Sequence, residues 1–308
     1  MKKRWQWLIV CLLSLFLAAV LFFCYSVINF HKGKKQSQLQ VNTKKNESFL
    51  GDERSETGEI TVLLIGDDGR EDDEDGGRSD TLMVLNYDTT KKEPKVISIM
   101  RDVYVNIPGV GMDKINAAYA YGGAALTKEV INDSFGLPIN YYAAIDFKIF
   151  NQLIDDFFSE GVQIDAETSF ELDGVEINQG EQLMDGYSLL QYARFRMDGE
   201  GDFGRVRRQQ QVADSLIKQA KSGLPIARLP RLLGAAIGYV DTDLPYDVLL
   251  DVGKNFLFGQ IGELQTLLVP VEGSWMFNDY TPSGSVLEID TVENQLAIET
   301  FLRVGEAP

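Results

Sequence analysis

The hydrophobic pattern separates an apolar N-terminal stretch from a longer body in which apolar and polar positions alternate. No charged side chain occurs over residues 5–30, and a helix of that length spans the roughly 30 Å hydrocarbon core of a bilayer. A cleaved signal peptide is the alternative, but its apolar region is usually shorter. The pattern predicts four parts: a short tail (1–4), a transmembrane signal-anchor helix (5–30), a flexible polar spacer (31–58) and a folded body (59–308).

Three short apolar runs at the start of the body have the composition of strands that are buried on both faces. They are ITVLLIG (60–66), LMVLNYD (82–88) and KVISIM (95–100). The polar segment Thr89–Pro94 predicts a hairpin turn between the second and the third. We therefore expect these runs to be neighbouring strands of a core sheet.

The rest of the body alternates between helical and extended patterns. Further strands are predicted at 141–147 and 265–270, and a β excursion at 161–177 that turns at Asp173-Gly174. Helices are predicted at 115–134, 148–158, 179–193, 203–222, after Pro225, at 245–257 and at 291–303. No second hydrophobic body with its own linker follows. The pattern predicts a single α/β domain, a sheet covered by helices.

Charge is distributed unevenly along the chain. Residues 1–45 carry eight basic and no acidic side chains, which leaves 21 basic against 46 acidic residues, a net charge of −25, in the remainder. An acidic body repels polyanions, so nucleic acid is not an expected partner. If the substrate is anionic, the cations that bind it must be concentrated locally.

The placement of cysteine and histidine excludes several kinds of site. Cys11 and Cys24 both fall in the apolar stretch, and His31 directly follows it. The body therefore has no disulfide framework, thiolate zinc site or cysteine nucleophile. A serine-histidine triad is excluded as well.

Two acidic motifs flank the end of the first predicted strand and the start of the second. They are GDDGR (66–70) and RSDT (78–81). Strand ends at one edge of an α/β sheet commonly form ligand sites, where Asp68 and Asp80 could converge on a magnesium ion completed by substrate phosphates. Ordinary turn aspartates have the same spacing, so the pattern leaves both interpretations open.

Arg101 and Asp102 directly follow the third predicted strand. An arginine that leaves a buried strand is costly unless it is paired. The sequence permits either an internal ion pair, of Arg101 with Asp102 or Asp80, or a ligand-binding role.

Arginines are concentrated in QYARFRMDGEGDFGRVRRQQQ (191–211). Arg194 and Arg196 share a face only if that segment is extended, whereas Arg205 and Arg208 share one face of a helix, for which Asp202 is a candidate N-cap. Arginine and a helix N-terminus both favour phosphate. The pattern favours a phosphate site over pairing with surface carboxylates.

A further motif, DKINAAYAYGG (113–123), places Lys114 at the start of an alanine-rich helix. Small residues there suit close core packing, or one wall of an apolar groove.

In this order, LLIGDDGR, RSDT, SIMRD, DKINAAYAYGG and QYARFRMDGEGDFGRVRRQQ resemble the LytR-CpsA-Psr family over about residues 60–215. Met100 departs from the family, which commonly has proline there. The resemblance implies an αβα fold with a central mixed sheet flanked by helices. It also implies an apolar pocket for a polyprenyl chain beside an arginine-lined pyrophosphate site.

Site residues follow from the same resemblance. It implies Mg²⁺, with Mn²⁺ as the alternative ion, on Asp68 and Asp80. It implies catalytic roles for Arg78, Arg101, Asp102, Arg194 and Arg196. The pyrophosphate-binding set it implies is Arg78, Arg101, Lys114, Arg194, Arg196, Arg205, Arg208 and Gln209. Arg70, Arg207 and Gln210 match less certain positions.

The implied activity is that of a phosphotransferase in cell wall biogenesis. It transfers an anionic glycopolymer, such as teichoic acid or capsular polysaccharide, from a polyprenyl pyrophosphate carrier to peptidoglycan. A polyprenyl-pyrophosphate hydrolase and a non-catalytic lipid-glycan binding module or regulator remain alternatives. Basic residues flank the apolar stretch almost equally, so charge does not decide the orientation of the anchor in the membrane. The resemblance implies a single pass through the cytoplasmic membrane, with the N-terminus in the cytoplasm and the body outside the cell.

Overall fold

The computed structural model describes residues 25–35, 49–54, 58–67, 79–223, 229–257 and 261–305. The chain forms two compact units. One comprises residues 1–43 and 224–239, and the other residues 44–223 and 240–308. The larger unit contains the α/β fold.

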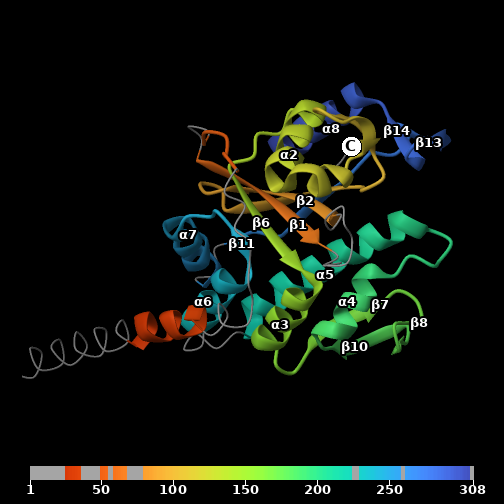
Figure 1. The fold of residues 1–308 in the computed structure, drawn as a ribbon. Helices are drawn as coiled ribbons and strands as arrows, with labels where there is room; N and C mark the ends of the chain where they lie inside the picture. The colour runs from red at the N-terminus through yellow and green to blue at the C-terminus, as the bar shows by residue number, and fades with distance from the viewer. Residues whose placement is uncertain are drawn as a thin grey trace, which may run out of the picture. The chain divides into compact units, whose positions relative to one another are not determined.

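A six-stranded mixed sheet lies at the centre of the larger unit, with strand order β11-β6-β1-β2-β3-β12 (Figure 1). β2 is antiparallel to both β1 and β3, whereas β1 is parallel to β6, and β3 is parallel to β12. The strands are β1 (Glu59–Asp67), β2 (Ser79–Asp88), β3 (Glu93–Ile99), β6 (Tyr141–Asp146), β11 (Asp241–Thr242) and β12 (Gln265–Val269). The predicted strands and the β2–β3 hairpin are confirmed.

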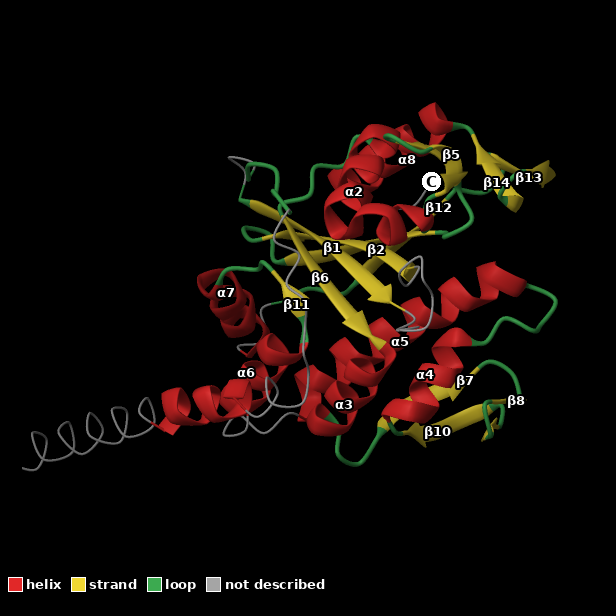
Figure 2. Ribbon diagram, viewed as in Figure 1, coloured by secondary structure: helices red, strands yellow, loops and turns green. Residues whose placement is uncertain are grey.

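Helices cover both faces of this sheet. α2 and α8 lie on one face, and α3, α4 and α5 on the other (Figures 1 and 2). The helices of this unit are α2 (Ala117–Phe135), α3 (Phe147–Phe157), α4 (Gly186–Arg194), α5 (Gly201–Gly223), α7 (Tyr246–Leu257) and α8 (Thr291–Val304). The predicted α/β architecture with a central mixed sheet is therefore confirmed.

Alternation along β1 divides the core between the two faces. Leu63 and Ile65 belong to the main core cluster, which includes α2, while Val62 packs in a smaller cluster with Val248 of α7. Leu64, on the same face as Val62, lines a cavity. An apolar run is needed here because both faces are covered.

The helix predicted at 179–193 is wrong in its first part. β10 (Gly180–Met184) pairs with β7 (Val162–Ala166), and α4 starts only at Gly186, where the carboxylate of Asp185 accepts a hydrogen bond from Ser188 N. Tertiary pairing with β7 overrides the local helical pattern. The turn at Asp173-Gly174 is confirmed, between β8 (Phe170–Leu172) and β9 (Val175–Ile177).

Two further hairpins were not predicted. One joins β4 (Tyr104–Ile107) to β5 (Gly111–Lys114), and the other joins β13 (Trp275–Thr281) to β14 (Gly284–Ile289). β14 is fixed to the segment after β3, because Leu287 N donates a hydrogen bond of 2.8 Å to Asp102 O and Leu287 forms a parallel bridge with Val103. The second hairpin is thereby tied to the Arg101-Asp102 motif.

Residues 49–54 belong to the larger unit and pack on its body. Asp52 N donates to Ile139 O, the carboxylate of Asp52 pairs with Lys128 at 2.6 Å, and Phe49 packs on Tyr142. The ordered contacts of the body thus begin before the predicted start at residue 59.

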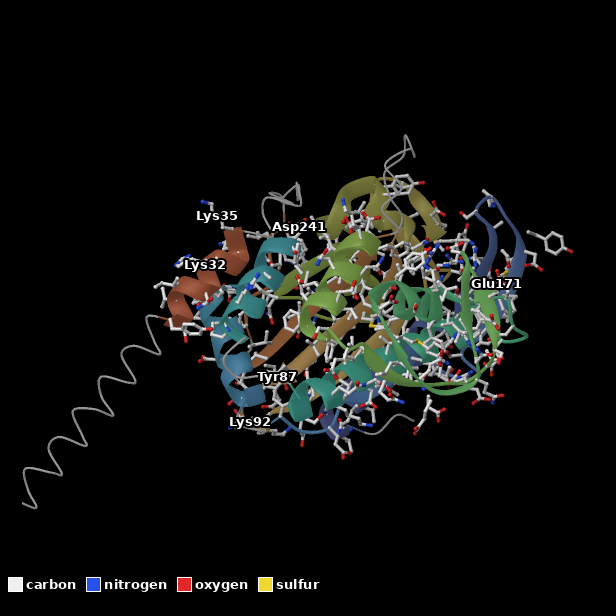
Figure 3. The ribbon with its side chains drawn as sticks, turned by 90° about the horizontal axis from the view of Figure 1, so that it is seen from below. Lys32, Lys35, Tyr87, Lys92, Glu171 and Asp241 are labelled. Atoms are coloured by element: carbon white, nitrogen blue, oxygen red, sulfur yellow. The ribbon has the colours of Figure 1, made fainter. Side chains whose placement is uncertain are left out.

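The smaller unit contains a helix over residues 25–35 and α6 (Leu229–Tyr239). Their backbones are in close contact, since a Cβ on Gly33 would lie 2.1 Å from Arg231 O and one on Gly234 would lie 2.1 Å from Phe30 O. Lys32 and Lys35 point outward from the first helix (Figure 3). Only glycine permits this crossing at either position.

The predicted transmembrane anchor falls mostly outside the described residues, which begin at residue 25. Within the described ranges, the helices are too short or too polar to cross a bilayer. The anchor stays a prediction, while the helix over residues 25–35 extends past its predicted end into the predicted spacer.

Candidate functional site

Four strand termini bring polar residues to one edge of the sheet. β1 and β6 are parallel and end there, at Asp67 and Asp146, and antiparallel β2 begins there with Ser79 and Asp80. β3 runs with β1 and ends at the same edge, immediately before Met100 and Arg101. The strand order therefore brings Asp80, Arg101 and Asp146 to one edge of the sheet, although they are far apart in sequence.

A cavity of about 610 Å³ opens beside this edge, between the sheet and the helices α3, α4 and α5. Leu64, Met83 and Ala143 form a cross-strand row on its sheet side, because Leu64 is paired with both of the others. The helices contribute mainly apolar side chains: Phe147, Phe150, Leu190, Ala193, Val212, Ala213 and Leu216. Such a cavity suits an apolar ligand that carries a polar group at one end.

The charged residues that line the cavity, within the described ranges, are Arg101, Arg194, Arg196 and Arg205 together with Asp80, Asp146 and Asp173. The cations exceed the carboxylates by one. An anionic ligand that binds these arginines therefore also lies near carboxylates. Its repulsion by the carboxylates is relieved if the side chains rearrange or if a cation binds with it.

Arg101 is the hub of an ion-pair network. Its Nη1 lies 2.6 Å from Asp80 Oδ1, and its Nε lies 3.5 Å from both Asp102 Oδ2 and Asp202 Oδ1. Burial disfavours the charged guanidinium, but Asp202, Asp80 and Asp102 outweigh it and raise the pKa of Arg101. Arg101 is thus paired internally and also lines the cavity, so both roles left open by the sequence are compatible with its position.

Asp202 and Arg205 form the most buried pair of this network, with Arg205 Nη2 at 2.8 Å from Asp202 Oδ1. Burial raises the pKa of Asp202 and lowers that of Arg205. The pair also leaves Arg205 Nε without a hydrogen-bond partner among the described residues. Asp202 lies in the first turn of α5, which begins at Gly201, so it is not at the N-cap position predicted for it; Asp198, in the turn before the helix, accepts from Gly201 N at 3.0 Å.

Arg194 and Arg196 both reach the cavity because α4 ends at Arg194 and Phe195 is extended. Arg194 is held by Asp173 at 3.0 Å and lies over the Phe147 ring. Arg196 is exposed and makes no ion pair within the described part of the chain. It is therefore free to bind an anion without first breaking an internal contact.

Gln209 also lines the cavity, and its amide donates to Thr81 Oγ1 at 3.0 Å. Gln210 donates instead to the buried Ser98 Oγ. The two glutamines diverge because they are consecutive on a helix.

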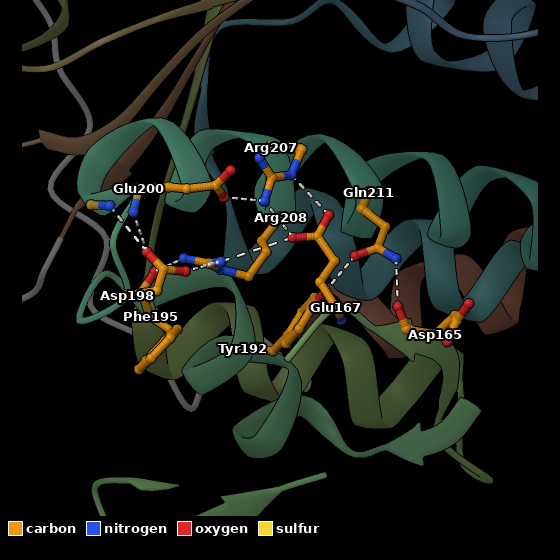
Figure 4. Close-up of polar contacts among 10 residues, drawn as sticks. Asp165, Glu167, Tyr192, Phe195, Asp198, Glu200, Arg207, Arg208 and Gln211 are labelled. Carbon is orange, nitrogen blue, oxygen red and sulfur yellow. Dashed lines mark hydrogen bonds and ion pairs between the residues drawn. The ribbon is translucent and has the colours of Figure 1, made fainter. Parts of the chain in front are cut away.

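Arg208 does not lie at the cavity. Its side chain is fully buried, with Nη1 at 2.7 Å from Asp198 Oδ2 and Nη2 at 2.5 Å from Phe195 O (Figure 4). Neighbouring Arg207 makes two hydrogen bonds of 2.9 Å to Glu167 and also pairs with Glu200. These contacts hold residues 195–200 against α5, so Arg208 supports the segment that carries Arg196 rather than contacting a ligand.

Lys114 lies outside the cavity lining and holds Asp102, with Nζ at 2.6 Å from Oδ1. Asp102 itself is not among the lining residues. The Lys114–Asp102 pair thus lies beside Arg101, at the point where the β13–β14 hairpin is attached to Asp102.

Two predicted site residues, Asp68 and Arg78, lie outside the described residues, as does Arg70. The described residues contain no group of three or more side chains that could hold a metal ion. Asp80 alone nevertheless fits the chemistry of magnesium, which is commonly bound by one or two carboxylates together with substrate phosphates.

Sequence reasoning missed three aspartates of this site. Asp146 and Asp173 line the cavity, and Asp202 is in the Arg101 network. Asp146 could have been found as the N-cap of α3, since it accepts from Ile149 N at 2.6 Å directly after a predicted strand. Asp173 had no local signal beyond its turn.

The LytR_cpsA_psr family model matches residues 23–298. The chain belongs to this family. The regulatory protein MsrR of Staphylococcus aureus (strain COL) is 37% identical over 281 residues, which cover 90% of this chain and 84% of the relative. The polyisoprenyl-teichoic acid–peptidoglycan teichoic acid transferase TagU of Halalkalibacterium halodurans is 33% identical over 277 residues, 89% of this chain and 90% of the relative.

Solved structures of LytR-CpsA-Psr proteins share the fold. B. subtilis TagV superposes with a TM-score of 0.67 and 26% identity, over 82% of this chain and all of the other. The family protein YwtF (TagT) with bound octaprenyl pyrophosphate lipid gives a TM-score of 0.59 and 23% identity, over 82% of this chain and 94% of the other.

Proposed function

We propose that this chain is a glycopolymer transferase that moves an anionic wall polymer from a polyprenyl pyrophosphate carrier to peptidoglycan. The observation that carries the proposal is an apolar cavity of about 610 Å³ whose edge bears four arginines. A polyprenyl pyrophosphate matches this cavity, because its apolar chain suits the apolar lining and its pyrophosphate suits the arginines at the edge. Family membership and the TagU relative's name support the transfer.

The residues have distinct tasks in this proposal. Leu64, Met83 and Ala143 contact the polyprenyl chain, while Arg196, which makes no ion pair within the described ranges, binds the phosphates first. Arg101 and Arg205 offset the charge that develops on the phosphate oxygens.

The transfer step forms one bond and breaks another. A sugar hydroxyl of peptidoglycan attacks the phosphorus next to the glycopolymer, and the bridging P–O bond to the polyprenyl phosphate breaks. The hydroxyl proton goes to a carboxylate. Asp102 is held by Lys114 and Arg101, and Asp80 by Arg101, so both are engaged by cations. Asp202 is engaged in the same way, by Arg205 at 2.8 Å and by Arg101 at 3.5 Å, and of these three carboxylates Asp80 is the one that lines the cavity.

Magnesium is part of the proposal through Asp80, with Asp68 as the second carboxylate implied by the family resemblance. When bound, the ion would supply positive charge that offsets the charge of the phosphates. The cavity lining carries only one more arginine than aspartate, too little positive charge to neutralise a pyrophosphate, so a cation bound together with the phosphates would supply the rest.

The deciding experiment uses the full chain in detergent, a synthetic polyprenyl pyrophosphate glycan, peptidoglycan oligomers and magnesium. Wild type should yield glycan joined to peptidoglycan through a phosphodiester, and Arg196→Ala should lose this product while keeping the wild-type melting temperature. Arg303→Ala is the matched control, an exposed arginine in the last turn of α8 and outside the cavity lining.

Two other outcomes would replace the proposal. Release of glycan phosphate without joined product would make the protein a hydrolase, and tight binding without turnover would make it a binding module.

Location belongs to the same proposal. We propose that the predicted anchor at 5–30 crosses the cytoplasmic membrane and that the body lies on its outer side, an orientation that the family resemblance supports. Protease added to cells stripped of their wall should cleave the body, and protection of the body would reverse this topology.

A further inference from the structure

A row of aromatic side chains lies outside the cavity and takes no part in the function proposed above. Phe203 of α5 lies 4.8 Å from Trp275 of β13, between ring centroids, and Trp275 lies 5.1 Å from Phe277. Trp275 and Phe277 are two residues apart on one strand and therefore share a face of the hairpin. We call Phe203, Trp275 and Phe277 the aromatic row.

The outer end of the row is open to solvent. Phe277 is 63% exposed, whereas Phe203 and Trp275 are partly buried against the main core. Core packing thus accounts for the inner two rings and leaves the third unexplained. Single exposed apolar side chains are common on protein surfaces, but Phe277 continues a row of packed rings and so extends one aromatic surface out to the solvent.

The inner end of the row lies next to the Arg101 hub along α5. Phe203 directly follows Asp202, whose Oδ1 lies 3.5 Å from Arg101 Nε. The hairpin is also fixed there, through the 2.8 Å hydrogen bond from Leu287 N to Asp102 O. The row therefore leads from the charged cluster to the solvent, on a path separate from the cavity, whose lining includes none of its three rings.

We propose that the aromatic row binds the sugar rings of the acceptor glycan. This inference rests on the proposed transferase function and adds to it the position of the acceptor. In a displacement at phosphorus the attacking and leaving oxygens are roughly in line, so the acceptor approaches from the side opposite the lipid phosphate. The lipid occupies the cavity, and the aromatic row reaches the same charged cluster from outside it.

The chemistry of the row favours a glycan over other occupants. One face of a pyranose ring presents C–H groups, which pack on the electron-rich face of an aromatic ring. The three rings carry no charge, so they bind sugar without the repulsion that a body of net charge −25 imposes on anionic groups.

The first test measures binding of chitotetraose, a soluble tetramer of N-acetylglucosamine, to the full chain in detergent, without lipid donor. Tryptophan fluorescence should report saturable binding by wild type, and Phe277→Ala should weaken it about three- to tenfold. Met276→Ala is the matched control, because Met276 is 64% exposed and points to the opposite face of the same strand. Absence of saturable binding by wild type, or equal loss in both variants, would overturn the proposal.

The second test is kinetic and separates the two sugar-bearing substrates. Phe277→Ala should raise the KM for peptidoglycan oligomers and leave the KM for the lipid-linked donor unchanged. A raised donor KM with an unchanged acceptor KM would assign the row to the donor glycan instead. If wild type transfers nothing, the transferase function fails, while the chitotetraose titration still decides whether the row binds sugar.

Two controls address other occupants of the hairpin. Sedimentation should show the same mass for wild type and Phe277→Ala, and flotation with liposomes should show the same membrane binding. A loss of self-association or of membrane binding in Phe277→Ala would assign the exposed ring to a second copy or to lipid, and would overturn the glycan site.

Discussion

Arg101 Nη1 lies 2.6 Å from Asp80 Oδ1, across the edge at which β2 begins and β3 ends. This pair joins a residue that the proposed function assigns to phosphate with one that it assigns to magnesium. Neither side chain can take up a ligand without weakening its contact with the other.

Asp80→Asn tests the metal assignment. Loss of the carboxylate charge should raise the magnesium concentration needed for half-maximal transfer at least tenfold, because an amide oxygen binds the ion more weakly. The measurement is the transfer rate against magnesium concentration, with chelated wild type as the reference. An unchanged magnesium dependence would remove Asp80 from the site.

Ala213→Phe tests the cavity as the lipid site. Ala213 lines the cavity from α5, and a phenyl ring there reduces the space available to a polyprenyl chain. Binding of undecaprenyl pyrophosphate should weaken at least tenfold, while the shorter farnesyl pyrophosphate should be affected less. Equal loss for both lipids would point to a disturbed phosphate site rather than a filled cavity.

Arg208→Ala tests the supporting role of the buried arginine. Its removal leaves Asp198 without a 2.7 Å ion pair and Phe195 O without a donor, so the free energy of unfolding should fall by about 3 kcal/mol. Arg207→Ala, at a half-exposed side chain, should cost no more than about 1 kcal/mol. Chemical denaturation of the two variants should show this order, and equal losses would contradict the assignment.

The Asp198 carboxylate should make stability depend on pH. Burial tends to raise its pKa, but the Arg208 guanidinium and the N–H groups of Gly201 and Glu200 outweigh it and lower the pKa below 3.8. Because the folded pKa is below the unfolded one, this stabilisation is complete above the unfolded pKa and is lost as pH falls through the folded pKa. Denaturation midpoints of wild type and Asp198→Asn should therefore converge at acid pH and differ at neutral pH.

Local patterns predicted most of the sheet and several helices. The apolar runs that became β1, β2 and β3 are continuous because both faces of the sheet are covered, and this leaves a clear signal. β10 was missed because its strand character comes from pairing with β7, which lies at a distance in the sequence. The β13–β14 hairpin likewise depends on its attachment to Asp102.

The sequence predicted which residues gather at the candidate site better than it predicted which side chains each of them contacts. Arg194 and Arg196 both reach the cavity because the backbone is extended after α4. An extended segment is the geometry in which the sequence predicts that these two side chains share a face. The burial of Arg208 could not be foreseen, since sequence spacing does not show which face of α5 packs inward beneath the segment 195–200.

The parallel pairing of β3 with β12 sets a condition on how the protein is made. Lys95 pairs with Gln265 in this ladder, and its ammonium group donates to Leu302 O at 2.6 Å. Until the last part of the chain has been synthesised, β3 is an unprotected sheet edge and the buried Lys95 lacks its acceptor. Contacts over such a sequence distance form slowly, and an exposed edge invites association with other chains. A product truncated before residue 265 should therefore aggregate rather than persist as a partly active enzyme.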